Sequence, residues 1–309
     1  MSTLVLTHES FLAHDTGPHH PESPGRLRSI MKALDQSALS GLRREEAPKA
    51  TAEQIARAHP GTYVEDVLAA MPTEGFGYLD ADTIVSPGSA EAMLRAAGAI
   101  VRAVDAVAGK EVDNAFCAVR PPGHHAESRR PMGFCLVNNA AVGAFHARAV
   151  HGHKRVAVID FDVHHGNGTQ EMFWHDADAF YASTHQFPFY PGTGSRAERG
   201  AHRNVVNVPL AAGDRGEVFR AGVSDEILPA LAVFKPDFIV ISAGFDAHRD
   251  DPLGQLRLTE TDFAWATAGI MDAARTLCGG RVVSVLEGGY NLGALADCVT
   301  AHVETLKDH

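Results

Sequence analysis

Short apolar runs alternate along this chain with longer stretches of helical periodicity, and this alternation restricts the fold more than any other feature. The short runs are rich in β-branched and other apolar residues and are typical of buried strands: 4–6, 115–119, 156–161, 179–183, 205–208, 238–242 and 282–286. Amphipathic stretches that predict helices lie between or after them, at 90–108, 139–150, 218–234, 261–277 and 292–306. Because strands separated by helices pair in parallel, the sequence predicts an α/β protein with a mostly parallel central sheet and helices on both faces.

Residues that start or stop helices agree with this pattern. Thr51 and Thr259 are each followed three positions later by a residue that can complete a capping box, and Gly109 and Gly279 stand where helices should end. A chain of 309 residues is near the upper size of a single core, and no linker or internal repeat interrupts it. We therefore expect one domain over residues 1–309.

Polar residues cluster directly after four of the expected strands. The loops that follow Val119, Phe161, Ser242 and Leu286 carry histidines, aspartates or a Gly-Gly-Tyr sequence. The carboxyl ends of parallel strands lie at the same edge of a sheet, which is where open α/β proteins bind ligands. We therefore expect these loops to form a single site.

Two of these loops carry residues suited to a metal ion. Asp160, Asp162 and His164 alternate along an extended segment and so share one face of it. Burying three polar groups at the end of a core strand is costly without a cation, although an ion-paired turn is the alternative. Asp246, after another apolar strand, is either the third ligand beside Asp162 and His164 or the N-cap of a helix. Three protein ligands with one position left for water are typical of catalytic zinc.

The other two loops supply groups for proton transfer and hydrogen bonding. His124 and His125 follow a stiff Pro-Pro-Gly sequence at the same sheet edge, which favours a general acid/base role over that of ordinary surface histidines. Tyr290 follows two glycines, and this support favours a phenol that reaches a substrate carbonyl over a residue packed in the core. No Gly-x-Ser-x-Gly motif is present, so we expect no acyl-enzyme.

These motifs together resemble the zinc-dependent histone deacetylase family, which includes class I and class II enzymes, bacterial deacetylases and acetylpolyamine amidohydrolases. The resemblance covers nearly the whole chain, from His20-Pro21-Glu22 and Arg26 through Asp82-Thr83, Ser86-Pro87-Gly88-Ser89, RPPGHHA, GFCLVNNAA, DFDVHHGNGTQ, YPGTG, SAGFDAH and LEGGY. It implies an arginase-like fold whose central sheet has eight strands.

The resemblance also implies roles for individual residues. The implied zinc ligands are Asp162, His164 and Asp246. The implied catalytic group consists of His124, His125, Tyr290, Asp160, which orients His124, and Asn167, which faces His125. The implied acyl-lysine tunnel and its rim contain Gly133, Phe134, Tyr190, Leu253, His20 and Asp82. A structural potassium ion is implied at Asp160, Asp162, His164, Ser183 and Thr184.

Three positions at which the family varies indicate which of its members this chain resembles. Asn167 stands where class I enzymes have Asp, which indicates a class II-like relative. Tyr190 stands where many relatives have Phe, which changes one wall of the implied tunnel. Leu253 stands where a polyamine-selective relative has an acidic residue, so a polyamine preference is weakened but not excluded.

Charge and composition restrict the partners. The formal net charge of −11 argues against direct binding of nucleic acid and favours cationic substrates. No apolar run is long enough for a membrane helix and no secretory leader is visible, so we expect a cytoplasmic protein without a membrane partner. The four cysteines form no CxxC pair and are expected to be reduced, while the 18 histidines suit metal binding and proton transfer.

The expected activity is zinc-dependent hydrolysis of the acyl amide of acetyl-lysine or a related acylated amine through a metal-activated water. One alternative is a two-metal ureohydrolase of the same fold, whose pattern is Asp-Ala-His-x-Asp and which would hold two manganese ions. Another is a non-catalytic acyl-lysine binding module. The sequence leaves the physiological substrate, the preferred acyl length and the oligomeric state, a homo-oligomer included, undetermined.

Overall fold

Eight strands form the centre of the protein in this computed structural model, which describes residues 2–36, 38–39 and 41–309. They are β1 (Thr3–Thr7), β2 (Arg43–Glu46), β5 (Asn114–Cys117), β6 (Val156–Asp160), β7 (Ala179–Gln186), β8 (Val205–Leu210), β9 (Phe238–Ala243) and β10 (Val282–Leu286). Their order is β2-β1-β5-β10-β9-β6-β7-β8, with every pairing parallel. The predicted eight-stranded parallel sheet is confirmed; Met1, where the expected domain begins, lies outside the described residues.

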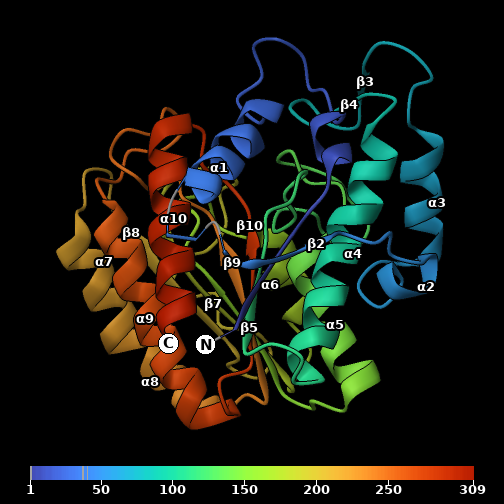
Figure 1. Cartoon of the computed structure of the whole chain (residues 1–309). Coiled ribbons are helices and arrows are strands. Elements are labelled where there is room, and N and C mark those ends of the chain that lie inside the picture. Colours follow the sequence, from blue (N-terminus) through green and yellow to red (C-terminus); the bar gives the residue numbers. More distant parts are fainter. Residues whose placement is uncertain (1, 37, 40) are drawn as a thin grey trace.

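Helices cover both faces of this sheet (Figure 1). On one face α4 (Ser89–Ala108) packs on α5 (Asn139–His151), and on the other α10 (Leu292–Asp308) packs on α9 (Glu260–Cys278) and α1 (Pro24–Gln36). The shorter elements are η1 (Glu9–Leu12), α2 (Ala52–Ile55), α3 (Gly61–Ala69), the β3–β4 hairpin (Gly77–Tyr78 and Ile84–Val85), α6 (Asn167–Phe173), α7 (Gly216–Gly222), η2 (Val223–Ile227) and α8 (Leu228–Phe234). The chain is therefore one three-layered α/β domain.

The structure differs from the sequence-based expectation at two elements. Strand β2 consists of charged residues only and pairs on one side only, with β1. An edge strand of this kind carries no apolar signal, and charges on it block pairing with another chain. The helix expected at 218–234 is divided into α7, the π-helical turn η2 and α8. Pro229 lies just after that turn and has no N–H to donate one turn back, which disfavours a continuous α-helix there. Periodicity alone also misses α1, α3 and α6.

The predicted helix caps are present. Thr51 Oγ1 accepts a hydrogen bond from the backbone N–H three residues later (3.2 Å), and the side chain of that residue accepts one from the Thr51 N–H (2.8 Å). At the start of α9 the Asp262 carboxylate accepts hydrogen bonds from the N–H (2.9 Å) and hydroxyl (3.0 Å) of Thr259. Gly109 and Gly279 follow α4 and α9 directly, as expected.

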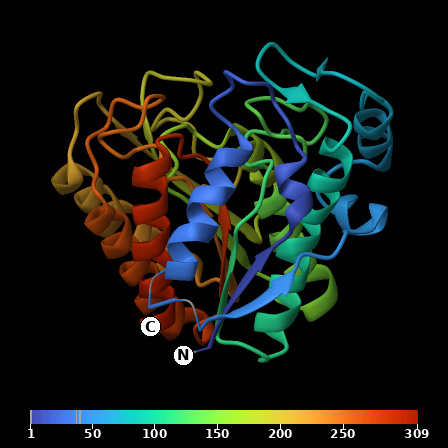
Figure 2. The same cartoon turned by 45° about the horizontal axis from the view of Figure 1, so that its top comes forward.

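The four polar loops leave neighbouring strands. Strands β5, β10, β9 and β6 are consecutive in the sheet, and each is buried along its whole length. Figure 2 shows the long loops gathered at one end of the molecule, away from both termini. The loops therefore rest on a rigid, water-excluded base and lie side by side, as a single site requires.

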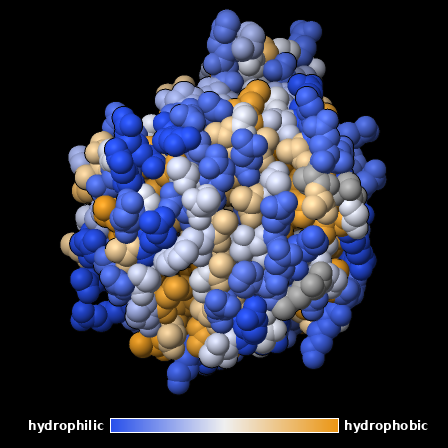
Figure 3. All heavy atoms as spheres, turned by 60° about the vertical axis from the view of Figure 1, so that its left-hand side comes forward, coloured by the Kyte–Doolittle hydropathy of each residue, from blue (hydrophilic) through white to orange (hydrophobic). Residues whose placement is uncertain are grey.

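The surface is that of a globular domain with scattered apolar side chains. Figure 3 shows mostly hydrophilic residues on the side of α7 to α10, with small apolar spots among them. Exposed apolar residues on these helices include Val218, Val233 and Trp265. Among the described residues, none of the helices combines the length and apolar character needed to cross a bilayer. All four cysteines are buried and free, which agrees with the expectation that they are reduced.

Candidate metal centre and active site

The three predicted metal ligands converge at the carboxyl ends of β6 and β9. The Nδ1 atom of His164 lies 3.2 Å from Asp162 Oδ1 and 3.1 Å from Asp246 Oδ2. All three residues are buried, and their donor atoms lie within 4.8 Å of one another. Two carboxylate oxygens and one imidazole nitrogen therefore face a common point, which is a suitable donor set for a metal ion.

Backbone groups from neighbouring loops hold the two carboxylates. Val163 N–H donates to Asp246 Oδ1 and Gly288 N–H donates to Asp162 Oδ2, each at 2.8 Å. A Cβ atom on Gly288 would lie 2.1 Å from Asp246 Oδ2, so the loop after β10 can approach the site this closely only with glycine there. Gly288, one of the two glycines that precede Tyr290, is thus tightly packed.

Negative charge is concentrated at this donor set. Burial and the nearby charge of Asp162 together raise the pKa of Asp246 to about 7. Burial also opposes ionisation of Asp162, but the charges of His124 and His164 hold its pKa far below the usual range. His164 is buried too, yet its contacts with both carboxylates raise its pKa to about 10. The site therefore favours positive charge, which a metal ion supplies.

A second group of possible metal ligands, Asp105, His146 and His151, lies between α4 and α5. The Nε2 atoms of both histidines lie 2.7 Å from the same Asp105 oxygen, a distance typical of charge-assisted hydrogen bonds. The Arg57 guanidinium contacts His146 Nδ1, so that nitrogen accepts and Nε2 carries the proton. A metal would need the lone pair of this Nε2, so hydrogen bonding accounts for the cluster without an ion.

The tandem histidines lie beside the predicted metal centre, and their rings have different partners. His124 Nδ1 lies 2.9 Å from Asp160 Oδ2, whereas His125 Nδ1 lies 2.8 Å from Asn167 Oδ1. Burial disfavours a charged His124, but the carboxylates around it, Asp160 first, raise its pKa well above the usual range. Burial and the positive charges of His124 and His164 lower the pKa of His125 well below it. The ring facing Asp160 therefore favours the charged form and the ring facing Asn167 the neutral form.

Glu287 connects the histidine loop to the loop that follows β10. One of its oxygens accepts hydrogen bonds from the N–H groups of Gly123 (2.7 Å) and His124 (3.1 Å), and the other accepts one from the Ser242 hydroxyl (3.1 Å). Burial raises the pKa of this carboxyl to about 7. No role is predicted for Glu287 from the sequence, although its place directly after the apolar run 282–286 is a signal for a residue at the site.

Tyr290 is held from several sides. The Arg26 guanidinium donates from Nε to Gly289 O (2.6 Å), and its carbon lies 4.9 Å from the centroid of the Tyr290 ring. Arg26 is itself buried and paired with Glu22 (3.0 Å). Burial raises the pKa of the Tyr290 phenol well above its usual range, although the Arg26 charge lowers it. The phenol therefore stays protonated and able to donate a hydrogen bond near neutral pH.

Aromatic rings surround these polar groups at the positions predicted for tunnel walls. The Phe134 ring lies 5.9 Å from the Tyr290 ring, and the Tyr190 ring lies 5.1 Å from the His125 ring, centroid to centroid. A Cβ atom on Gly133 would lie 2.5 Å from the His125 ring, so this position admits no side chain. Sequence reasoning misses Phe189, whose ring stacks on His164 at 5.4 Å.

The remaining predicted residues occupy supporting positions. Asp82 Oδ1 accepts the Gly133 N–H (3.2 Å), and the carbonyl oxygen of Asp82 lies 3.1 Å from His20 Nε2. The His20 ring in turn lies 4.6 Å from the Phe134 ring. Leu253 is partly exposed in the loop that follows Asp246. His20 and Asp82 are thus joined to the predicted tunnel wall through Gly133 and Phe134.

The two residues predicted only for potassium lie on β7. Ser183 is the direct register partner of Asp160 in the pairing of β6 with β7. Thr184 Oγ1 is buried and has no hydrogen-bond partner among the described residues.

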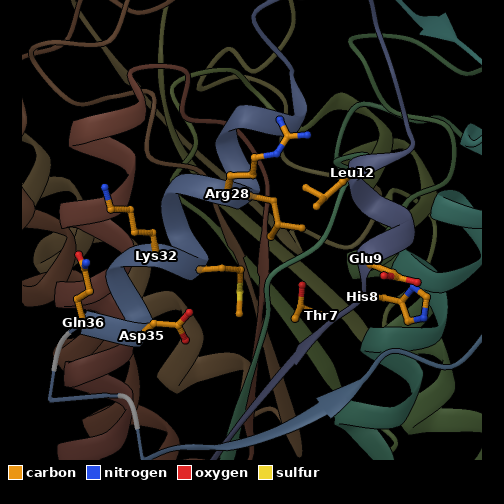
Figure 4. A pocket seen from close by; sticks show the side chains of 10 residues that line it. Thr7, His8, Glu9, Leu12, Arg28, Lys32, Asp35 and Gln36 are labelled. Atoms are coloured by element: carbon orange, nitrogen blue, oxygen red, sulfur yellow. The ribbon is translucent and has the colours of Figure 1, made fainter.

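A separate cavity of about 480 Å³ lies between η1 and α1. Its walls include Leu12, Leu27 and Met31, with Arg28 beside them, and Figure 4 shows Leu12 and Thr7 at the space between the two helices. The residues that line it are separate from the predicted metal ligands and the groups around them.

Known proteins resemble this chain over most of its length. The family profile described as "Histone deacetylase domain" matches residues 20–306. The chain is 39% identical over 302 residues to a "Probable deacetylase" of Archaeoglobus fulgidus, covering 96% of this chain and 83% of the relative. It is 39% identical over 327 residues to a "Histone deacetylase-like amidohydrolase" of Pseudomonas aeruginosa, covering 98% and 86%.

A solved structure has the same fold as this chain. The crystal structure of the HDA15 HD domain matches with a TM-score of 0.94 and 37% sequence identity, over 100% of this chain and 88% of that chain. The predicted arginase-like fold is therefore confirmed. Since the profile covers nearly the whole chain and the likeness extends through all four site loops, the protein belongs to the histone deacetylase family.

Proposed function

We propose that the protein is a zinc-dependent amidohydrolase that removes the acyl group from acetyl-lysine or a related acylated amine through a metal-activated water. The convergence of His164 Nδ1 on the carboxylates of Asp162 and Asp246 carries this proposal. A neutral imidazole, His125, and a protonated phenol, Tyr290, lie in the same site. These are the groups that hydrolysis of an amide requires.

The donor set at Asp162, His164 and Asp246 fits zinc. Zinc accepts carboxylate oxygen and imidazole nitrogen, and three protein ligands leave a position for water. The pKa of Asp246, raised by burial and by Asp162, reflects buried negative charge that a divalent cation neutralises. When bound there, zinc makes a water molecule more acidic and polarises the substrate carbonyl.

His125 has the correct tautomer for a general base. Asn167 Nδ2 donates to Glu127 Oε1 (2.9 Å), which turns Asn167 Oδ1 toward His125 to accept from its Nδ1 (2.8 Å). The free lone pair of His125 is therefore on Nε2. In the proposed reaction Nε2 takes the proton of the attacking water and later delivers it to the leaving amine.

Tyr290 and His124 stabilise charge in the proposed reaction. The Tyr290 phenol donates a hydrogen bond to the carbonyl oxygen as negative charge develops on it. His124, whose pKa is raised chiefly by Asp160, stays protonated and acts through its charge rather than as the base. The two histidines thus divide the work of proton transfer and electrostatic stabilisation.

The rings of Phe134 and Tyr190 would enclose the aliphatic part of the acylated amine. Their places beside Tyr290 and His125 would direct the amide carbonyl toward the predicted metal centre. Leu253 offers no negative charge to a second ammonium group, so acyl-lysine is favoured over a polyamine. The overall charge of −11 also favours a cationic substrate region outside the tunnel.

We also propose the structural potassium ion at Asp160, Asp162, His164, Ser183 and Thr184. Support comes from the pairing of Asp160 with Ser183 and from the unpartnered Thr184 Oγ1 among the described residues. Hard cations bind oxygen ligands, which this region supplies.

The pattern of the ureohydrolase alternative, Asp-Ala-His-x-Asp, is present at residues 246–250. Among the described residues, the groups that could hold a metal include Asp246 but neither His248 nor Asp250. His248 Nε2 faces Glu260 at 3.4 Å, and the Asp250 side chain is 58% exposed. Of this segment only Asp246 contributes to the ligand group found with Asp162 and His164.

Metal analysis combined with a substrate panel tests the proposal. The purified protein should contain one zinc ion per chain and hydrolyse acetyl-lysine peptides, with activity lost on chelation and restored by zinc. The panel should include longer acyl-lysines and acetylated polyamines. Two manganese ions with guanidino-substrate hydrolysis would instead support the ureohydrolase, and acyl-lysine binding without turnover would support the binding module.

A further inference from the structure

One buried carboxylate joins the phenol loop to the loop that carries Leu253. Asp251 is 7% exposed and lies five residues after Asp246 in the loop that follows β9. Its Oδ2 atom accepts hydrogen bonds from the N–H groups of Tyr290 (2.6 Å) and Asn291 (3.1 Å). Its Oδ1 atom accepts one from the N–H of Leu253 (2.9 Å). Burial raises the pKa of the Asp251 carboxyl group, and the hydrogen bonds from these three N–H donors oppose that shift.

The loops on either side of this carboxylate have little freedom to move. Arg26 donates to Gly289 O, and Asp251 accepts from the Tyr290 N–H of the same peptide group, so a cation and an anion hold the two ends of the peptide that joins Gly289 to Tyr290. A Cβ atom on Gly254 would lie 2.4 Å from Asp246 O, so the segment after Leu253 is packed against the predicted metal-ligand loop. A displacement at Asp251 would therefore reach both Tyr290 and Leu253.

We propose that Asp251 is a positioning residue that fixes Tyr290 and Leu253 relative to each other, so that the oxyanion donor and this part of the tunnel rim act as one unit. The inference rests on the proposed function for the role of the phenol. Asp251 does not touch the reacting atoms; its effect on rate passes through the position of Tyr290. Because the backbone N–H of residue 253 makes the contact, the link is independent of the side chain at that position.

Asp251→Asn is the direct test, because the amide keeps the shape of the carboxylate. Its NH2 group would face backbone N–H donors in place of one of the two accepting oxygens. Misplacement of a group by about 1 Å can cost ~10²-fold in rate, so we expect kcat on an acetyl-lysine peptide to fall by roughly 10-fold to 10²-fold. The matched control is Asp250→Asn, which changes the adjacent, exposed carboxylate. Asn291 Nδ2 contacts only the backbone carbonyl of Asp250, so this control should keep wild-type kcat.

A double-mutant cycle separates positioning from general damage. In the Tyr290→Phe background, Asp251→Asn should cause little further loss of kcat, because the hydroxyl through which it acts is already gone. A full multiplicative loss in the double mutant, or no loss in the single mutant, would overturn the inference. Failure of the proposed function has a different signature, since wild-type protein would then lack amidohydrolase activity altogether.

The effect of Asp251 on Leu253 is measured separately, through substrate selectivity. The ratio of kcat/KM for an acetyl-lysine peptide to that for a small acetylated amine should change several-fold in Asp251→Asn but not in Asp250→Asn. An unchanged ratio would overturn the coupling to the rim. If Asp251→Asn does not fold, the same cycle with Asp251→Ser, which keeps one acceptor oxygen, decides the question by the same criteria.

Discussion

The imidazole rings of His124 and His125 lie 4.1 Å apart, centroid to centroid, and their pKa values move in opposite directions. Both rings are buried, so burial alone would lower both values. The carboxylate of Asp160 reverses this effect for His124, whereas Asn167 gives His125 a neutral acceptor. One charged and one neutral imidazole side by side are what the proposed reaction requires.

Removal of one predicted metal ligand should remove the metal. In Asp246→Ala the site keeps only Asp162 and His164, so we expect loss of bound zinc and near-complete loss of turnover. Zinc content by mass spectrometry and kcat on an acetyl-lysine peptide provide the measurement. His151→Ala, in the hydrogen-bonded cluster with Asp105, is the control and should keep both zinc and activity. Wild-type zinc and activity in Asp246→Ala would refute the ligand assignment.

Tyr290→Phe deletes the phenol oxygen and leaves the ring in place. Loss of one oxyanion donor typically reduces kcat by ~10² to 10³, and we expect a reduction of that size with KM much less affected. Steady-state kinetics on protein with verified zinc content measures it. A wild-type kcat would mean that Tyr290 is only a packing residue.

The two tandem histidines should differ in importance. His125→Ala removes the proposed base and should lower kcat by at least ~10² to 10⁴, the usual contribution of general acid/base catalysis. His124→Ala removes an electrostatic donor and should retain more activity. Parallel measurements of kcat for both variants at one pH test the ranking, and a larger loss in His124→Ala would reverse the assignment.

Asn167→Asp should move the acidic limb of the rate profile. A carboxylate at position 167 stabilises the charged form of His125 and raises its pKa. The base must be neutral, so activity falls as pH drops through this pKa, and raising the pKa shifts that limb to higher pH. The profile of kcat/KM against pH for wild type and variant shows the shift. An acidic limb that stays in place would argue against His125 as the base.

The buried ion group behind Tyr290 should control acid stability. Glu22 accepts hydrogen bonds from Arg26 (3.0 Å) and Arg120 (2.6 Å), and although burial opposes it, Arg120 and Arg26 hold its pKa far below the ordinary value of 4.5. Its contribution to the free energy of unfolding is therefore complete above pH 4.5 and is lost as pH falls toward the lower folded-state value.

Glu22→Gln should thus destabilise the protein by about 3–5 kcal/mol at pH 7, the usual cost of breaking a buried ion pair. Urea unfolding at several pH values should show this difference shrinking below pH 4.5. Glu53→Gln, which changes a side chain that is 89% exposed, is the control and should have little effect. A difference that does not depend on pH would contradict the role of the Glu22 charge.

The alternation of strands and helices and the identity of the polar loops could be predicted from the sequence, because both depend on local order. Asp162 and His164 are two residues apart on one extended segment, so their common face follows from the period of a strand. Asp246 could be added to the predicted metal ligands because the carboxyl ends of parallel strands meet at one edge of the sheet. Strand β2 could not be found in this way, since its charged residues carry no apolar pattern.

The sequence by itself determined which chemical groups this protein carries and at which strand ends they stand. Only the tertiary structure decided that β10 lies between β5 and β9, and therefore which loops touch. Two hydrogen bonds depend on that order. Arg26 donates to Gly289, 263 residues away, and Asp251 accepts from Tyr290, 39 residues away. The physical reason is that periodicity is a property of neighbouring residues, whereas a buried charge is satisfied by whichever donors the packed fold brings to it.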